Sequence, residues 1–147
     1  IAATGANITV AGERAFYNRG TDSITMPDRH RFVGTKTSTA TEGWYSTLLH
    51  ELTHWSGAET RCARTFGERF GDDAYAMEEM VAELGAAFLC GDLGITVEPR
   101  ADHADYIGHW LRILKGDRKA IFTAASAANK AAEYLKSIAQ IEHQEAA

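Results

Sequence analysis

The chain has 147 residues, of which 45% are hydrophobic and 24% charged, and this composition indicates one soluble globular domain without room for a separate recognition domain. Its formal net charge of -5 argues against nonspecific nucleic-acid binding, because neutralising phosphates requires a cationic surface. No stretch approaches the length of a membrane span and the first residues do not resemble a signal peptide, so we expect a cytoplasmic protein with no membrane partner.

Short strands are predicted at the start of the chain, where apolar and polar residues alternate at 7–10, 14–18 and 23–26. Gly and Asp residues separate these segments, which favours a small antiparallel sheet of about three strands. Pro27 follows the last segment and suits a sheet edge. An edge strand at 23–26 could bind an extended peptide by strand addition, although an ordinary edge strand gives the same pattern.

About four helices are expected after the strands, which makes the fold class α+β. Thr39 and Glu42 fit a capping box for a helix over 41–55, and Gly57 fits its end. Asp residues mark the starts of three further helices, and Gly94 and Gly116 mark the ends of the first two. Their predicted ranges are about 72–93, 102–116 and 117–139, with a long irregular connection at 56–71 and a frayed end at 142–147.

Large apolar side chains and two cysteines complete the expected core. The apolar residues predicted to fasten the helices together are Trp44, Trp55, Phe88, Trp110, Leu111 and Leu114. Cys62 and Cys90 are too few and too far apart for a zinc ribbon or a redox pair, so we expect reduced, buried thiols.

The first predicted helix contains the motif His50-Glu51-Leu52-Thr53-His54. The four-residue spacing puts both imidazoles on one face, one turn apart, where they can reach one divalent ion beside Glu51. This is the geometry of a zinc hydrolase in which Glu51 is the general base. The alternative is an ordinary helix with two histidines satisfied by other partners.

The second predicted helix carries Tyr75, Glu79 and Glu83, four residues apart and therefore on one face. Two inward-facing carboxylates cost several kcal/mol to desolvate unless a positive charge meets them. A metal ion held by two imidazoles would supply that charge. Tyr75 could reach the same site, although an aromatic residue on a helix more often packs in the core.

The succession of His-Glu-x-x-His and, on the next helix, Glu-x-x-Ala-Glu resembles the gluzincin arrangement of metallopeptidases. The resemblance implies that Glu79 is the third metal ligand and that Glu83 orients a ligand histidine. The reverse assignment, with Glu83 as ligand, stays open. Glu78, the neighbour of Glu79, is expected to be an exposed helix carboxylate.

The runs YSTLLHELTHWSG, FGDDAYAMEEMVAELGAAFLC and HADYIGHWLRILKGDRKAIFTAAS are similar to the C-terminal domain of ArdC-type antirestriction proteins. The resemblance covers most of the chain and implies a zincin-like fold. In that family, whose members travel on mobile elements, the domain follows an N-terminal domain that binds single-stranded DNA. We therefore interpret 1–147 as a single C-terminal domain of a longer protein, in contact with single-stranded DNA only through the domain it lacks.

His103 and Tyr106 begin the third predicted helix, in the region where peptidases of this general type often place a His or Tyr that stabilises the oxyanion. His103 could instead make a helix N-terminal contact. Both are candidate catalytic residues.

Two main hypotheses follow. The first is a zinc-dependent metallopeptidase domain of an antirestriction protein, with Zn²⁺ or another divalent ion such as Mn²⁺ as cofactor and a peptide or protein as substrate. The second is a metal-stabilised module that binds DNA or a partner without hydrolysis. Phosphodiester hydrolysis ranks last, because the sequence shows no second metal cluster and no basic groove.

Overall fold

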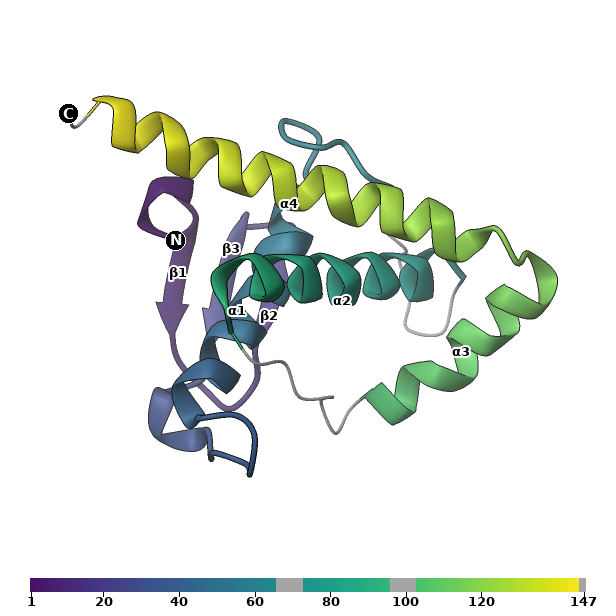
Figure 1. Cartoon of the computed structure of the whole chain (residues 1–147), viewed down its shortest axis with the longest axis horizontal. Coiled ribbons are helices and arrows are strands. Elements are labelled where there is room, and N and C mark those ends of the chain that lie inside the picture. The colour runs from purple at the N-terminus through teal and green to yellow at the C-terminus, as the bar shows by residue number, and fades with distance from the viewer. Residues whose placement is uncertain (66–72, 96–102, 146–147) are drawn as a thin grey trace.

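The computed structural model describes residues 1–65, 73–95 and 103–145; side chains are not described at 103–107, 109 and 140–145. The described elements comprise three strands, β1 (Asn7–Val10), β2 (Phe16–Asn18) and β3 (Ser23–Met26), and four α-helices, α1 (Ala40–Ser56), α2 (Asp73–Leu93), α3 (His103–Gly116) and α4 (Ala120–Glu145). Figure 1 shows the sheet at one end of the molecule and α3 at the other, with α4 lying along α2. The predicted α+β class, with three strands and four helices, is confirmed.

The sheet is mixed, with the strand order β1-β3-β2. β2 pairs with β3 antiparallel, as predicted, but β1 pairs with β3 parallel, so the all-antiparallel prediction was wrong for β1. β3 is the central strand, and its hydrogen bonds are used on both sides. The prediction of β3 as an edge strand that adds a peptide is therefore also wrong. Ile24 and Met26 of β3 are fully buried against the helices.

The helix α1 begins at the predicted capping box. The Thr39 side chain accepts a hydrogen bond from the Glu42 backbone N–H at 3.2 Å, and the Glu42 carboxylate accepts one from the Thr39 N–H at 2.7 Å. The pair satisfies two N–H groups that would otherwise lack helical partners. At the other end, the Gly57 N–H donates to the His54 carbonyl at 2.8 Å. The predicted helix over 41–55 and its stop at Gly57 are confirmed.

The helix α2 is buried on two sides because it packs against both α1 and α4. It ends as predicted before Gly94, whose φ of 66° suits glycine. α4 extends to Glu145, so the predicted fraying at 142–145 is wrong. The segment 140–145 contains no Gly or Pro, and its residues continue the helix readily.

The main core lies between the sheet and the helices α1, α2 and α4. Trp44 and Trp55 are buried there, as predicted, and Trp110 and Leu114 pack against a smaller cluster around Met80. The core prediction was wrong for Phe88 and Leu111, which are 37% and 52% exposed and belong to neither cluster.

The two cysteines are free thiols. Cys90 is buried and Cys62 is only half-buried, since it lies in the turn that follows α1. Among the described helices, none combines the length and the hydropathy needed to cross a membrane.

Candidate metal centre

The facing sides of α1 and α2 bring the motif histidines into a buried position. His50 and His54 lie one turn apart on α1, with side-chain exposures of 5% and 11%. Their Nε2 atoms face each other at 3.1 Å. The capped, regular helix fixes this spacing, so the predicted single face for both imidazoles is confirmed.

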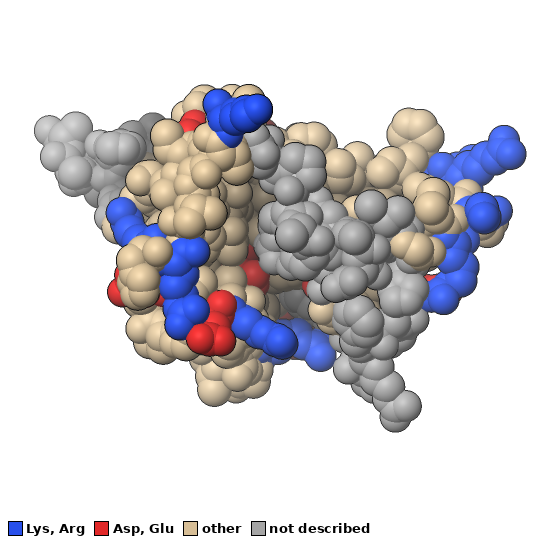
Figure 2. All heavy atoms as spheres, turned by 90° about the horizontal axis from the view of Figure 1, so that it is seen from below, with Lys and Arg blue, Asp and Glu red and all other residues tan. Residues whose placement is uncertain are grey.

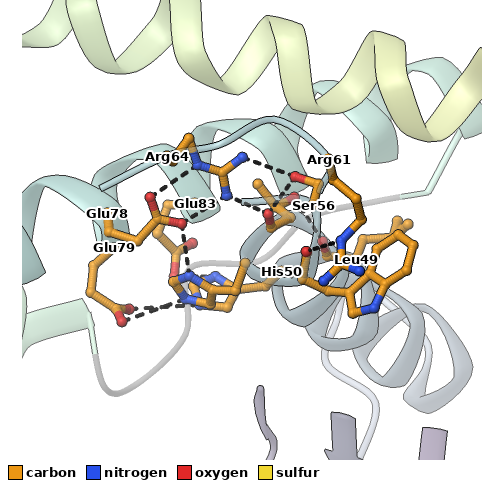
Figure 3. Close-up of polar contacts among 11 residues, drawn as sticks. Leu49, His50, Ser56, Arg61, Arg64, Glu78, Glu79 and Glu83 are labelled. Atoms are coloured by element: carbon orange, nitrogen blue, oxygen red, sulfur yellow. Dashed lines mark hydrogen bonds and ion pairs between the residues drawn. The ribbon is translucent and has the colours of Figure 1, made fainter. Parts of the chain in front are cut away.

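Glu79 of α2 lies opposite the two imidazoles. One carboxylate oxygen is 3.6 Å from His50 Nε2 and the other is 3.5 Å from His54 Nε2. Figure 3 shows the Glu79 carboxylate directed toward the imidazole of His50. One nitrogen from each histidine and one oxygen of Glu79 lie within 4.8 Å of one another. Two imidazole nitrogens and a carboxylate suit Zn²⁺ and related divalent ions, so the donor set fits a metal.

The second nitrogen of each imidazole also faces a carboxylate. His50 Nδ1 is 3.1 Å from Glu83 and His54 Nδ1 is 3.2 Å from Glu78. Glu83 thus lies behind His50, and Glu79 lies on the side where the two Nε2 atoms converge. This geometry favours Glu79 over Glu83 as the third donor. Outer carboxylates of this kind fix the orientation and the tautomer of histidines that bind metals.

Glu78 was expected to be exposed, and that prediction is wrong. Glu78 is 6% exposed and contacts both His54 and the guanidinium of Arg64, which comes from the connection after α1. No signal in the sequence marked Glu78 as buried, because α2 carries acidic residues at several other positions as well. Arg64 itself carried no signal, because its role depends on the path of an irregular connection.

Glu51 is 4% exposed, and its carboxylate makes no hydrogen bond or ion pair with any residue in the described ranges. Its charge nevertheless acts on the site, where it raises the pKa values of His50 and His54. A buried carboxylate without a hydrogen-bond donor is costly. Its position beside the two imidazoles therefore fits a site that is completed by a cation and by a proton donor such as water.

The pKa values of the site reflect tight pairing. Burial alone would lower the pKa of His54, but hydrogen bonds to Glu78 and Glu79 outweigh it and raise the pKa to about 10. The pKa of His50 is raised in the same way by Glu79 and Glu83. Burial alone would raise the pKa of Glu79. Its hydrogen bonds to His50 and His54 outweigh burial and hold that pKa well below the usual range. The carboxylates thus lie where a cation bound by the two imidazoles would meet negative charge, and its binding would release any proton that the imidazoles hold.

Three further residues were predicted to belong to the site, and the structure describes the side chain of only one of them, Tyr75. Tyr75 is half-buried on α2, one turn before Glu79. His103 is the first residue of α3 and Tyr106 lies in its first turn, but both side chains fall outside the described part of the structure. Their predicted part in stabilising an oxyanion stays a prediction. Of the predicted irregular connection, residues 57–62 form turns, 63–65 have no regular structure, and 66–72 lie outside the described ranges.

The charge distribution over one face is visible in Figure 2. Lys and Arg side chains gather toward the two sides of this face, and acidic atoms lie within a hollow between them.

Comparisons with known proteins show which family and which solved structures this chain is similar to. The family described as MPTase-PolyVal, zincin-like metallopeptidase, matches residues 1–127. A curated relative, the uncharacterised protein y4eC of Sinorhizobium fredii, is 44% identical over 134 residues, which is 91% of this chain and 42% of that protein. The DNA primase TraC of Escherichia coli is 40% identical over 144 residues, or 97% of this chain and 10% of the primase.

Two solved structures of the antirestriction protein ArdC from the R388 plasmid are also similar, each at 41% identity. The Mn(II)-bound structure has a TM-score of 0.77 and covers 94% of this chain and 49% of that one. The metal-free structure has a TM-score of 0.76 and covers 95% of this chain and 48% of that one. The similarity to ArdC-type proteins expected from the motifs is confirmed. This chain spans less than half the length of the relatives it matches.

Proposed function

This chain belongs to the family of zincin-like metallopeptidases, and from that membership we propose that it is a metal-dependent peptidase domain that hydrolyses a peptide bond. The observation that carries the proposal is the convergence of His50, His54 and Glu79 on one point between α1 and α2. Three protein ligands leave a fourth position for water or substrate, which is the arrangement of catalytic rather than structural zinc sites.

The metal ligands in this proposal are His50 Nε2, His54 Nε2 and Glu79. Zn²⁺ is the proposed ion, and Mn²⁺ also suits a set of two nitrogens and an oxygen. The ArdC structure that contains Mn(II) supports the proposal that more than one divalent ion can bind at such a site. When bound, the ion would act as a Lewis acid that polarises the scissile carbonyl and lowers the pKa of a water.

Glu51 is the proposed general base. It accepts a proton from the attacking water and returns it to the leaving amine, a role that suits a buried carboxylate without a competing donor in the described ranges. Glu83 holds His50 in place through Nδ1. We assign the stabilisation of the oxyanion to His103 or Tyr106 at the start of α3, and give Tyr75 a supporting position beside Glu79.

The biological setting of the proposal is antirestriction. A peptide or protein is the proposed substrate, and contact with single-stranded DNA is proposed to require a further domain outside 1–147. The printed names of the relatives, an antirestriction protein and a DNA primase, support a role connected with DNA transfer or protection.

A second candidate is a metal-stabilised module that binds DNA or a partner without hydrolysis. The observation in its favour is that the same domain makes up 10% of a primase and 49% of an antirestriction protein. A DNA primase and an antirestriction protein have different tasks, and a shared binding domain explains their similarity to this chain as well as a shared peptidase domain does.

The experiment that tests the proposal compares Glu51→Gln and Glu59→Gln with the unmodified chain. Glu59 is an exposed carboxylate just after α1 and serves as the matched control. We expect about one zinc per chain in all three proteins by mass spectrometry. Cleavage of a peptide library should fall by roughly 10²–10⁴-fold in Glu51→Gln alone. Undiminished cleavage by Glu51→Gln would exclude the mechanism, and metal binding without cleavage by any protein would favour the binding module.

A further inference from the structure

A single arginine links the two helices of the candidate metal centre. The Arg64 guanidinium donates through Nε to one oxygen of Glu78 at 3.0 Å and through Nη2 to the other at 2.7 Å. This is the two-pronged geometry in which Arg binds a carboxylate most strongly. The side chains are 10% and 6% exposed, so the pair is largely shielded from water.

The same guanidinium also binds the last turn of α1. Nη1 donates to the Ser56 hydroxyl at 2.9 Å and Nη2 donates to the Thr53 carbonyl at 2.5 Å. Thr53 and Ser56 flank His54 in the sequence. A positive charge at the carboxyl end of a helix is also favourable for the helix dipole. Figure 3 shows Arg64 between Glu78 on one side and Ser56 on the other.

The connection after α1 is folded so that Arg64 returns to that helix. The Cys62 N–H donates to the Ser56 carbonyl and the Arg64 N–H to the Gly57 carbonyl, each at 2.9 Å. Ala63 takes a φ of 49°, a left-handed conformation that is uncommon for alanine. Ordering this turn therefore has a cost, which the contacts of Arg64 help to offset.

We propose that Arg64 and Glu78 are positioning residues for His54. Glu78 accepts the hydrogen bond of His54 Nδ1, which leaves Nε2 facing Glu79 and His50. Arg64 holds Glu78 in that position and joins it to the turn of α1 that carries His54. The inference rests on the proposed function, because it assigns these residues to a centre that binds a metal through His54.

The two histidines are supported differently in this scheme. His50 has one carboxylate behind it, Glu83, which lies on the same helix as Glu79. His54 lies at the end of α1, where helices fray most readily. A carboxylate from α2 and a cation from the following connection together restrain both the ring and the backbone at this position. Loss of either should misplace Nε2 and weaken metal binding.

The test is the dissociation constant for Zn²⁺ of the purified chain, measured by competition with a chelator. We expect Glu78→Ala and Arg64→Ala each to raise it roughly 10–100-fold. Because Arg64 and Glu78 position the same imidazole and contact each other, the double variant should lose less Zn²⁺ affinity than the product of the two single losses. Glu78→Gln keeps an acceptor for Nδ1, and Arg64→Lys keeps a cation. These milder variants should fold and show smaller losses.

Arg61→Ala is the matched control. Arg61 lies in the same connection and its side chain is 9% exposed. Its Nε donates to the Trp55 carbonyl at 2.6 Å, but its Nη1 donates to Asp22 near the sheet and not to Glu78. Its variant should bind Zn²⁺ as the unmodified chain does, even if urea unfolds it more easily. Equal affinities for Arg61→Ala and all Arg64 and Glu78 variants would overturn this inference and leave the metal centre intact. Absence of Zn²⁺ binding by the unmodified chain would overturn the proposed function, and the inference with it.

Discussion

Gly85 of α2 lies directly against the side chain of Thr53 of α1. A methyl group at Gly85 would come within 2.6 Å of Thr53 Cγ2 and 2.9 Å of its Oγ1. Thr53 is fully buried, and its hydroxyl donates to the Leu49 carbonyl at 2.8 Å, so it has little freedom to move. Thr53 precedes His54 directly. The contact therefore sets the distance between the two helices at the candidate metal centre.

Gly85→Ala should destabilise the protein in spite of the better helix propensity of alanine. The added methyl forces the helices apart, at a typical cost of about 1–3 kcal/mol, against a gain of at most about 1 kcal/mol from propensity. We expect a lower urea midpoint and a weaker affinity for Zn²⁺, because Glu79 moves away from the histidines.

Gly91→Ala is the control for this substitution. Gly91 also lies in α2, and a methyl group there would meet nothing within 4 Å. It should stabilise the protein by about 0.5–1 kcal/mol without changing Zn²⁺ affinity. Equal urea midpoints for the two variants would show that the contact of Gly85 with Thr53 does not limit the helix spacing.

Added metal should stabilise the folded chain. A ligand present at about 100 times its dissociation constant contributes about 2.7 kcal/mol, so Zn²⁺ should raise the melting temperature and a chelator should reverse the rise. His50→Ala should lose the response. His30→Ala should keep it, because His30 is exposed and pairs with Asp28 away from the centre. A shift that survives His50→Ala would place the metal elsewhere.

The ion pair of Asp22 with Arg61 should contribute to stability only above acidic pH. The hydrogen bond from Arg61 lowers the pKa of Asp22. A carboxyl group with a lowered pKa in the folded state stabilises it above its unfolded pKa of about 3.9, and the effect is lost as pH falls through the folded value. Asn at this position tolerates the φ of 47° and removes the charge.

The measurement is the urea midpoint of the unmodified chain and of Asp22→Asn, in chelator, across the acidic range. The difference should be largest near neutral pH and should shrink below about pH 4. A difference that does not change with pH would show that the side chain acts through packing or its backbone conformation.

The two cysteines should differ in reactivity. Burial raises the pKa of the Cys90 thiol to about 11, and Cys90 is fully buried, whereas Cys62 is half-buried. Only a thiolate with access to the reagent reacts readily. Iodoacetamide should therefore label Cys62 in the folded protein and both residues in urea, as mass spectrometry can show. Labelling of Cys90 at the same rate as Cys62 in the folded protein would indicate that the core opens at α2.

The parts of the fold that sequence reasoning predicted well are those fixed by local interactions. The capping box at Thr39 and the spacing of His50 and His54 involve neighbours within one or two helical turns. The shared face of Glu79 and Glu83 on α2 follows the same logic, but the approach of Glu79 to the histidines of α1 is a long-range contact. The local features require only that the helix forms, and the sequence around them contains nothing that opposes it.

Other parts depend on contacts that a single sequence does not specify. The alternation in 7–10 indicates a strand but not its partner, so the parallel pairing with β3 was missed. Glu78 looks like any helix carboxylate until the turn that follows α1 brings Arg64 to it. The extra length of α4 was missed because polar residues at a chain end favour a frayed helix as readily as a continuous one.

The strand order also has a kinetic consequence. β2 and β3 are separated by a short turn and can pair as a local hairpin, whereas β1 must wait for β3 to be in place and then close a longer loop around β2. Loop closure costs entropy before the new contacts form. We therefore expect the first ten residues to join the sheet late in folding, after the hairpin has docked on α1.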